Sequence, residues 1–419
     1  EAHNNLGIIL KELGRLDEAE SSFRKAIELK PKYVEAHYNL GIIVKELGRL
    51  DEAEASFRQS IVFKPDYAEA YNNLGVILKE LNRLDEAEAS YRQAIALKPD
   101  YAEAHSNLGV TLQQLGKLGE TEASYRQAIV LKPDYAKAHY NLGNTLQELG
   151  RLDESEASYR RAIALKPDYA EAHSNLGVTL QELIKLDEAE ESCRQAIVLK
   201  PDFAEAHYNL GITLQELGIL DESEASYTQA IVLKRDYAEA HSNLGMILKE
   251  LGRLGEAEAS LRQAIVLKPG YAEAYNNLGV ALLELGKVDE AEANYKQAIK
   301  IKPDYVEAFY NLSFPHLLRG SLEKGFNFYE SRLRKTKPTV APARFNLIWD
   351  GDKSLSGKHF VIYEEQGLGD IIQFCRYMPL LEQKGADITF KVRPNLHALL
   401  QTMDSNSKLV TSLPEENEI

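Results

Sequence analysis

The chain has 419 residues, of which 44% are hydrophobic and 27% are charged, and its formal net charge at pH 7 is −15. Because an acidic chain repels phosphate backbones and anionic membrane surfaces over most of its length, nucleic acid is not a predicted partner. No apolar stretch is long enough to span a bilayer, and the only two cysteines, Cys193 and Cys375, lie far apart, so we predict no disulfide and a cytoplasmic location.

An Asn-Leu-Gly triplet recurs every 34 residues along the chain, from Asn5 to Asn277. A fixed period of this length is typical of a stacked repeat protein. The unit at residues 68–101 contains two apolar-periodic segments joined by a short link, which predicts a helical hairpin. The pattern is already running at Glu1, so we expect the natural protein to be longer. Nine units reach Tyr305, and a degenerate tenth is expected to end at Lys337-Pro338, with Pro315 interrupting its first helix.

Small and polar residues mark the expected helix ends. Glycine occupies the end of the first helix in most units, as at Gly14 and Gly48, because it adopts the left-handed conformation without strain. Ile184 stands at one of these glycine positions. Aspartates such as Asp17 are expected to cap the second helix, and Asp66 and its equivalents to cap the helix that follows each Lys-Pro pair.

We number each unit so that Ala68 is position 1, and use these position numbers throughout. Stepping 100° per residue places positions 4, 7, 8, 11 and 14 of the first helix on one face, which is the predicted buried side. Positions 2, 6, 9 and 13 lie opposite, and in a stacked array they recur on the open concave wall. Position 6 is asparagine in every unit: Asn5, Asn39, Asn73, Asn107, Asn141, Asn175, Asn209, Asn243, Asn277 and Asn311.

The invariant asparagine predicts a surface for an extended polypeptide. Its amide offers both acceptor and donors, so it can satisfy the backbone of a peptide without reading its side chains. Helices in adjacent units lie roughly 10 Å apart and a strand rises about 3.3 Å per residue, so one asparagine meets every third peptide residue. The alternative is that these asparagines only bond to neighbouring helices in the stack.

Two other repeated positions exclude other kinds of site. Position 2 is mostly glutamate and only Lys137 is basic there, which disfavours a basic clamp for a C-terminal carboxylate. Position 4 carries seven histidines, such as His105 and His139, but residues 34 apart on a buried face cannot converge on one metal ion. We therefore predict packed histidines, no metal site and no cofactor.

The unit resembles the tetratricopeptide repeat (TPR). The family's Leu-Gly pair, small residue, aromatic, alanine and proline are matched by Leu74-Gly75, Ala87, Tyr91, Ala94 and Pro99. The resemblance covers about four-fifths of the chain and implies an α-α superhelix over residues 1–338. The asparagine ladder is also similar to the repeat arm of protein O-linked N-acetylglucosamine transferases, which implies that the groove presents substrate polypeptides.

Residues 339–419 depart from the repeat. Strands are expected at 359–364 and 387–392 with a third near 408–411, and helices at 371–383 and 396–403, which predicts an incomplete, Rossmann-like parallel sheet. Between the first strand and helix, Gly367-Leu368-Gly369-Asp370 resembles the acceptor-side half of heptosyltransferase-like glycosyltransferases. That resemblance implies a glycine loop at Gly367 and Gly369 and makes Asp370 the candidate general base. The alternative is that Asp370 only caps the helix.

These observations predict a module that binds extended polypeptides or other proteins and recruits substrates for a glycosyltransferase. The second nucleotide-sugar-binding domain of such enzymes does not fit into eighty residues, so the chain as given is expected to be inactive. Two alternatives are that a full-length parent glycosylates proteins or glycans, or that the chain is a scaffold with a vestigial tail. The sequence defines neither the partner, the sugar nor the oligomeric state.

Overall fold

A computed structural model describes residues 1–334, 354–363, 371–372, 375–403 and 405–412. The chain divides into two compact units, residues 1–247 and 248–419. The predicted domain boundary at residue 338 lies outside the described residues.

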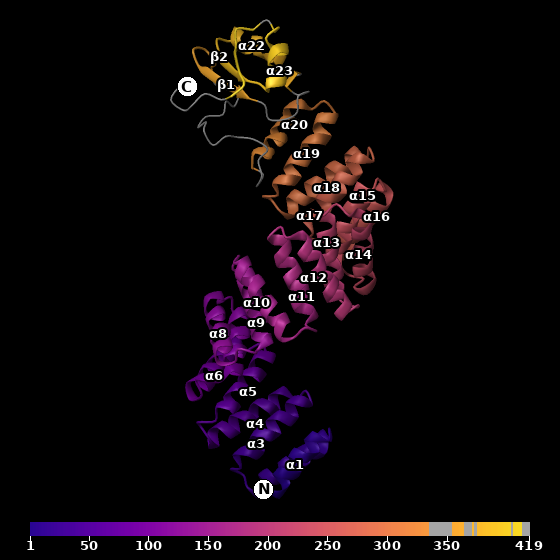
Figure 1. The fold of residues 1–419 in the computed structure, drawn as a ribbon. Helices are drawn as coiled ribbons and strands as arrows, with labels where there is room; N and C mark the ends of the chain where they lie inside the picture. Colours follow the sequence, from indigo (N-terminus) through magenta and orange to yellow (C-terminus); the bar gives the residue numbers. More distant parts are fainter. Residues whose placement is uncertain (335–353, 364–370, 373–374, 404, 413–419) are drawn as a thin grey trace. The chain divides into compact units, whose positions relative to one another are not determined.

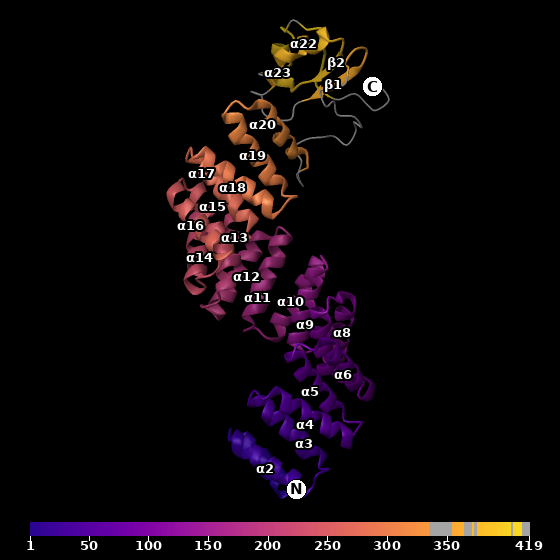
Figure 2. The same cartoon turned by 180° about the vertical axis from the view of Figure 1, so that it is seen from behind.

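The first unit consists of helical hairpins that follow one another in chain order (Figures 1 and 2). The hairpins are α1 (Ala2–Glu12) with α2 (Leu16–Leu29), α3 (Val34–Glu46) with α4 (Leu50–Phe63), α5 (Ala68–Glu80) with α6 (Leu84–Leu97), α7 (Ala102–Gln114) with α8 (Leu118–Leu131), α9 (Ala136–Glu148) with α10 (Leu152–Leu165), α11 (Ala170–Glu182) with α12 (Leu186–Leu199), and α13 (Ala204–Glu216) with α14 (Leu220–Leu233). The unit ends within α15 (Ala238–Glu250). The predicted solenoid of hairpins is confirmed.

The predicted left-handed residues at the ends of the first helices are confirmed. Gly14 and Gly48 have φ of 72° and 78°, and Asn82 and Ile184, which replace glycine, have φ of 59° and 61°. Asparagine tolerates this conformation, whereas in a β-branched residue it is strained. Ile184 is also 82% exposed.

The predicted aspartate caps are wrong. α2 begins at Leu16 with Arg15 as its N-cap, and no side chain caps it, so Asp17 lies within the first turn. α5 likewise begins at Ala68 after Tyr67, without a side-chain cap, so Asp66 lies one residue before the cap. These helices start where stacking buries their apolar faces, and Asp17 interacts instead with the positive end of the helix dipole.

Most hairpins are held together by one aromatic ring packed on one glycine, whereas Cys193 takes the place of the ring in the sixth hairpin and Leu261 in the eighth. Tyr91, at position 24 of α6, is fully buried, and a Cβ placed on Gly75 of α5 would lie 2.7 Å from its ring. The predicted buried face is only partly correct, because Leu74, Gly75 and Leu78 are buried while Tyr71 at position 4 is half-buried. The face is rotated toward positions 5 and 10, where Asn72 and Ile77 are buried.

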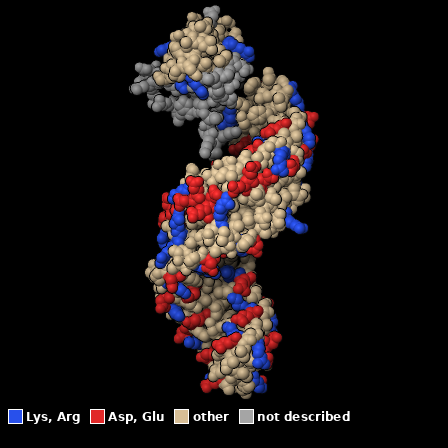
Figure 3. Space-filling view, turned by 45° about the vertical axis from the view of Figure 1, so that its right-hand side comes forward, with Lys and Arg blue, Asp and Glu red and all other residues tan. Residues whose placement is uncertain are grey.

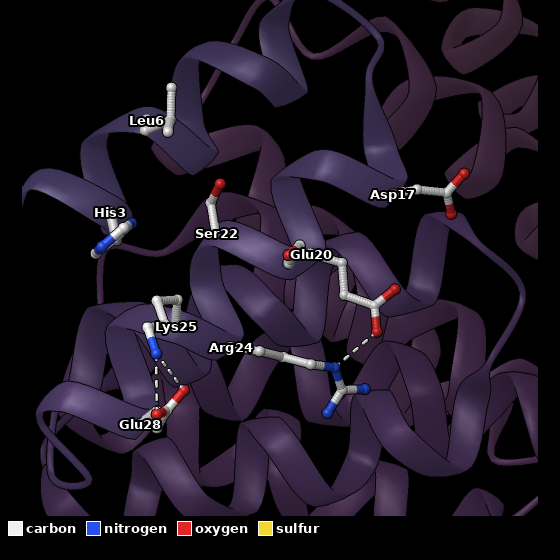
Figure 4. A pocket seen from close by; sticks show the side chains of 9 residues that line it. His3, Leu6, Asp17, Glu20, Ser22, Arg24, Lys25 and Glu28 are labelled. Atoms are coloured by element: carbon white, nitrogen blue, oxygen red, sulfur yellow. Dashed lines mark hydrogen bonds and ion pairs between the residues drawn. The ribbon is translucent and has the colours of Figure 1, made fainter.

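Stacking of one hairpin on the next completes the core. Leu6 on α1 is 45% exposed, whereas the equivalent Leu40 is 6% exposed because α2 packs over it. An open pocket of about 600 Å³ therefore remains against the first hairpin, lined by His3, Leu6 and charged residues of α2 (Figure 4). The backbones of several odd-numbered helices also approach that of the next odd-numbered helix, as in α7 and α9, whereas the backbones of the described even-numbered helices do not come comparably close to one another. The odd-numbered helices therefore lie on the inner side of the curvature of this unit.

The even-numbered helices are joined by ion pairs, which we call the ion-pair ladder and define by positions 16, 19, 21 and 25. Between α4 and α6, Arg58 pairs with Glu54 at 2.7 Å and with Glu86 at 3.3 Å, and Arg83 pairs with Glu54 at 2.7 Å and Glu86 at 2.6 Å. Acidic and basic side chains are correspondingly interspersed over the repeats in Figure 3.

The second unit contains the repeat helices α16 (Leu254–Leu267), α17 (Ala272–Glu284), α18 (Val288–Ile301), α19 (Val306–Leu318) and α20 (Leu322–Tyr329), followed by the 3₁₀ turn Glu330–Arg334. The predicted interruption at Pro315 is wrong, because α19 continues through it to Leu318. The buried Pro315 removes one backbone donor, and packing of α19 against α18 and α20 holds the remaining turns in place. The predicted end of this repeat at Lys337-Pro338 lies outside the described residues.

A three-stranded parallel sheet forms the C-terminal part of the second unit. Its strands are β1 (His359–Tyr363), β2 (Asp387–Lys391) and β3 (Lys408–Val410), in the order β1-β2-β3. Two short helices, α22 (Met378–Gln383) and α23 (Pro394–Leu400), alternate with the strands and share a core with them that includes Phe390 and Leu396. The predicted alternation of strands and helices is confirmed, although α22 begins later than predicted, after the 3₁₀ turn Cys375–Tyr377.

Candidate functional site

The position-6 asparagines lie on the odd-numbered helices, half-buried except for the exposed Asn5. In most hairpins the Nδ2 atom donates a hydrogen bond to the position-5 side chain of the preceding hairpin. Asn73 donates to the Tyr38 hydroxyl at 2.9 Å and Asn107 to Asn72 Oδ1 at 3.0 Å. The same bond joins Asn39 to Asn4, Asn175 to Tyr140, Asn209 to Ser174, Asn243 to Tyr208 and, in the second unit, Asn311 to Asn276.

These bonds combine the two predicted roles of the asparagines. Most of these amides are oriented by an N–H that donates to the preceding hairpin, which is the stacking role. At Asn73, Asn107 and Asn209 the bond uses one N–H, so Oδ1 and the second N–H of the amide remain chemically suited to a peptide N–H and C=O. Asn175 and Asn243 donate a second bond, to Asn144 and Tyr227, so at these two residues Oδ1 remains suited to a peptide N–H. A side chain that is fixed in this way loses less rotamer entropy when a ligand binds.

Sequence reasoning missed position 5, which holds the asparagine in place. The position alternates among asparagine, serine and tyrosine, and each of these offers an oxygen acceptor. Asn72 and Ser106 are buried, at 6% and 1% exposure, although neither is apolar. A polar residue recurring directly before the asparagine was the signal, because a buried polar group in a packed array requires a partner.

The fifth hairpin has the most polar version of this surface. Position 9 is apolar in the neighbouring hairpins but is Asn144 here, and its Oδ1 accepts from Asn175 Nδ2 at 2.9 Å and from the Tyr159 hydroxyl at 2.6 Å. Burial, as the largest effect, raises the pKa of Tyr159 above its ordinary value, so the hydroxyl remains a donor. The same hairpin carries the basic Lys137 at position 2.

Most glutamates at position 2 are paired with a lysine of their own hairpin. Lys98 donates to Glu69 at 3.1 Å, and its ammonium group lies 4.8 Å from the centre of the Tyr101 ring. The same arrangement joins Lys200 to Glu171 and Phe203. A hydrogen bond from its own backbone lowers the pKa of Glu171 most, and a hydrogen bond from Lys200 lowers it further, although burial opposes both effects. These carboxylates are therefore already partly neutralised beside the asparagines.

The position-4 histidines bond to the backbone. His37 Nε2 lies 2.8 Å from the carbonyl oxygen of Pro31, and His105 Nε2 lies 3.1 Å from that of Pro99. Their rings are half-buried rather than packed in the core as predicted. Among the described residues there is no group of three or more His, Cys, Asp or Glu side chains suited to a metal ion, and no described helix is long and apolar enough to cross a membrane.

The predicted residues Gly367, Gly369 and Asp370 lie outside the described residues. β1 ends at Tyr363, immediately before this segment.

Family profiles match most of the chain. The "TPR repeat" profile matches residues 7–48, 43–82, 77–116, 114–150, 148–183 and 185–218, and the "Tetratricopeptide repeat" profile matches 208–272 and 242–306. The protein belongs to the tetratricopeptide-repeat family. No curated protein sequence matches the chain.

Solved structures share the fold. A crystal structure of the APC/C hetero-tetramer Cut9-Hcn1 is similar with a TM-score of 0.51 and 16% identity, over 72% of this chain and 59% of that one. This chain therefore spans less than two-thirds of that relative. YrrB, described as a TPR protein with an unusual peptide-binding site, is 25% identical with a TM-score of 0.37, over 44% of this chain and 96% of YrrB. A tetratricopeptide repeat protein from Parabacteroides merdae ATCC 43184 is 19% identical with a TM-score of 0.49, over 59% and 98% of the two chains.

Proposed function

We propose that the inner face of the repeats binds extended polypeptide through the position-6 asparagines. Proteins of this family generally mediate protein–protein interactions. The observation that carries the proposal is the bond to the preceding hairpin from asparagines such as Asn73, Asn107 and Asn209, which fixes the amide and leaves Oδ1 and one N–H for a ligand. Each peptide hydrogen bond contributes only about 0.5–1.5 kcal/mol, so the affinity comes from many such contacts in series.

The test uses two sets of unstructured peptides. In the first the order of the side chains is scrambled, and in the second the backbone is methylated while the side chains stay the same. Scrambled peptides of one composition are expected to bind with similar affinity, because the amides contact backbone. N-methylation at every third peptide nitrogen should weaken binding at least tenfold, because it removes the donors that reach Oδ1. Equal binding of methylated and unmethylated peptides would refute backbone recognition by this face.

We also propose that the bound polypeptides are substrates for a glycosyltransferase, as the resemblance of residues 363–374 to heptosyltransferase-like enzymes suggests. The alternation of strands and helices around a parallel β1-β2-β3 sheet supports this proposal. The chain alone is expected not to turn over nucleotide sugars, because the donor-binding domain requires more residues. Incubation with radiolabelled nucleotide sugars and a bound peptide measures this, and sugar transfer by the chain alone would contradict the inactive-fragment hypothesis.

A further inference from the structure

Two aliphatic side chains occupy exceptional positions in neighbouring hairpins. Ile184 lies in the turn after α11, where the other described hairpins of both units have glycine or asparagine. Ile219 precedes α14 at position 16, where the other eight complete units have arginine or lysine. Ile184 is 82% exposed and Ile219 is 38% exposed.

The two residues lie on the same edge of the first unit. They belong to equivalent turns of successive hairpins, and their preceding helices α11 and α13 contact each other directly. Side chains bridge the ends of such helices elsewhere, as Gln147 Nε2 does by donating to Glu182 Oε1 at 2.7 Å. The turns that carry the two exposed aliphatic side chains therefore follow one another along this edge.

Ile219 also removes one cation from the ion-pair ladder. Where the ladder is complete, Arg83 pairs with Glu54 of the preceding hairpin and Glu86 of its own. Ile219 stands in place of that arginine, so Glu190 and Glu222 share Arg194, at 2.8 and 2.6 Å. Two carboxylates with one cation leave an excess of one negative charge.

The loss of this cation uncovers a carboxylate. The side chain of Glu190 is 24% exposed, compared with 14% for the equivalent Glu54, which Arg83 covers. The adjacent cation Lys185 is already paired with Glu156 at 2.8 Å. Ile219 thus lies at the position of the missing cation beside two carboxylates, and Ile184 lies in the equivalent turn of the preceding hairpin.

We infer that this edge, formed by Ile184, Ile219, Glu190 and Glu222, is a second docking surface. Its ligand is a polypeptide segment with an arginine flanked by aliphatic residues. The ligand's guanidinium supplies the cation that position 16 supplies in other hairpins, and its planar fork can bond to both carboxylates at once. The neighbouring aliphatic side chains cover the two isoleucines. This surface belongs to the interhelical turns and does not use the position-6 asparagines.

The test compares a fluorescently labelled Gly/Ser-rich peptide with a central Leu-Arg-Leu and the matching Leu-Gln-Leu peptide. The wild-type chain is expected to bind the arginine peptide at least tenfold more tightly. The double variant Ile184→Gly, Ile219→Arg restores the usual residues, so it should remain folded with an unchanged circular dichroism spectrum and lose that preference. The double variant Asn175→Ala, Asn209→Ala alters the inner face and is expected to retain the preference for the arginine peptide.

The matched variants separate this surface from the peptide-binding face. Loss of the arginine preference in the asparagine variant, with the double isoleucine variant unaffected, would place the contact on the inner face and overturn the inference. Equal binding of the two peptides by the wild-type chain would also overturn it. Either result leaves the test with N-methylated peptides intact, because that test measures a different contact.

Discussion

At the scale of single residues, the array repeats a few exact packing relationships, so exceptions to them have measurable consequences. Ile184 is a β-branched residue at φ 61°, where glycine is unstrained and L-residues other than asparagine and aspartate pay roughly 1–2 kcal/mol. Ile184→Gly should therefore stabilise the chain by about 1 kcal/mol, measured as an increase in the midpoint of urea denaturation. Asn82→Gly is the matched control and is expected to change the midpoint little. A destabilised Ile184→Gly variant would contradict this account of strain.

Two glycines of the fourth hairpin should respond in opposite ways to the same added methyl group. A Cβ on Gly109 would lie 2.6 Å from the fully buried Tyr125 ring, so Gly109→Ala should destabilise the chain by about 1–3 kcal/mol. Gly119 lies within α8 with nothing within 4 Å of its Cβ direction, so Gly119→Ala should stabilise it by about 0.5–1 kcal/mol. Thermal denaturation of both variants measures the difference, and the same sign for both would be inconsistent with this packing.

At the scale of helices, most hairpin boundaries could be predicted from sequence because glycine, proline and apolar periodicity act locally. The aspartates could not be placed correctly, because α2 begins one residue before Asp17 and α5 begins two residues after Asp66, so stacking rather than capping chemistry sets the start of each helix. The partner of each asparagine was missed for a related reason. The position-5 partner of each bond lies in the preceding hairpin. The Asn73–Tyr38 bond therefore joins residues 35 apart and forms only when hairpins are stacked.

Because of the ion pairs between helices, the free energy of unfolding depends on pH in the acidic range. Hydrogen bonds from Lys296 and then Arg319 lower the pKa of Glu292 to about 2, although burial opposes them. In the unfolded chain the carboxyl returns to about 4.5, so its contribution is present above that pH and is lost as the pH falls from about 4.5 to about 2. Thermal denaturation between pH 7 and pH 2 should therefore show a smaller loss for Glu292→Gln than for the wild-type chain. Parallel curves would contradict a depressed pKa at Glu292.

At the scale of the whole molecule, the chain combines a repeat array with a parallel sheet. The repeat architecture was predictable because one 34-residue pattern recurs through most of the chain. The candidate site was predictable in position but not in geometry, since only the structure shows that asparagines such as Asn107 and Asn209 use one N–H in stacking. The roles of Gly367, Gly369 and Asp370 stay predictions.

The central claim is that the asparagine amides bind polypeptide, and one measurement tests it most directly. A diverse library of unstructured peptides is titrated against the wild-type chain and a variant with Asn107, Asn141, Asn175 and Asn209 changed to alanine. The matched control changes four exposed glutamines of the even-numbered helices to alanine: Gln93, Gln127, Gln195 and Gln229. The account predicts that the asparagine variant keeps its helical circular dichroism and loses broad peptide binding, while the glutamine variant binds normally. Unchanged binding by the folded asparagine variant would make the asparagines stacking residues only.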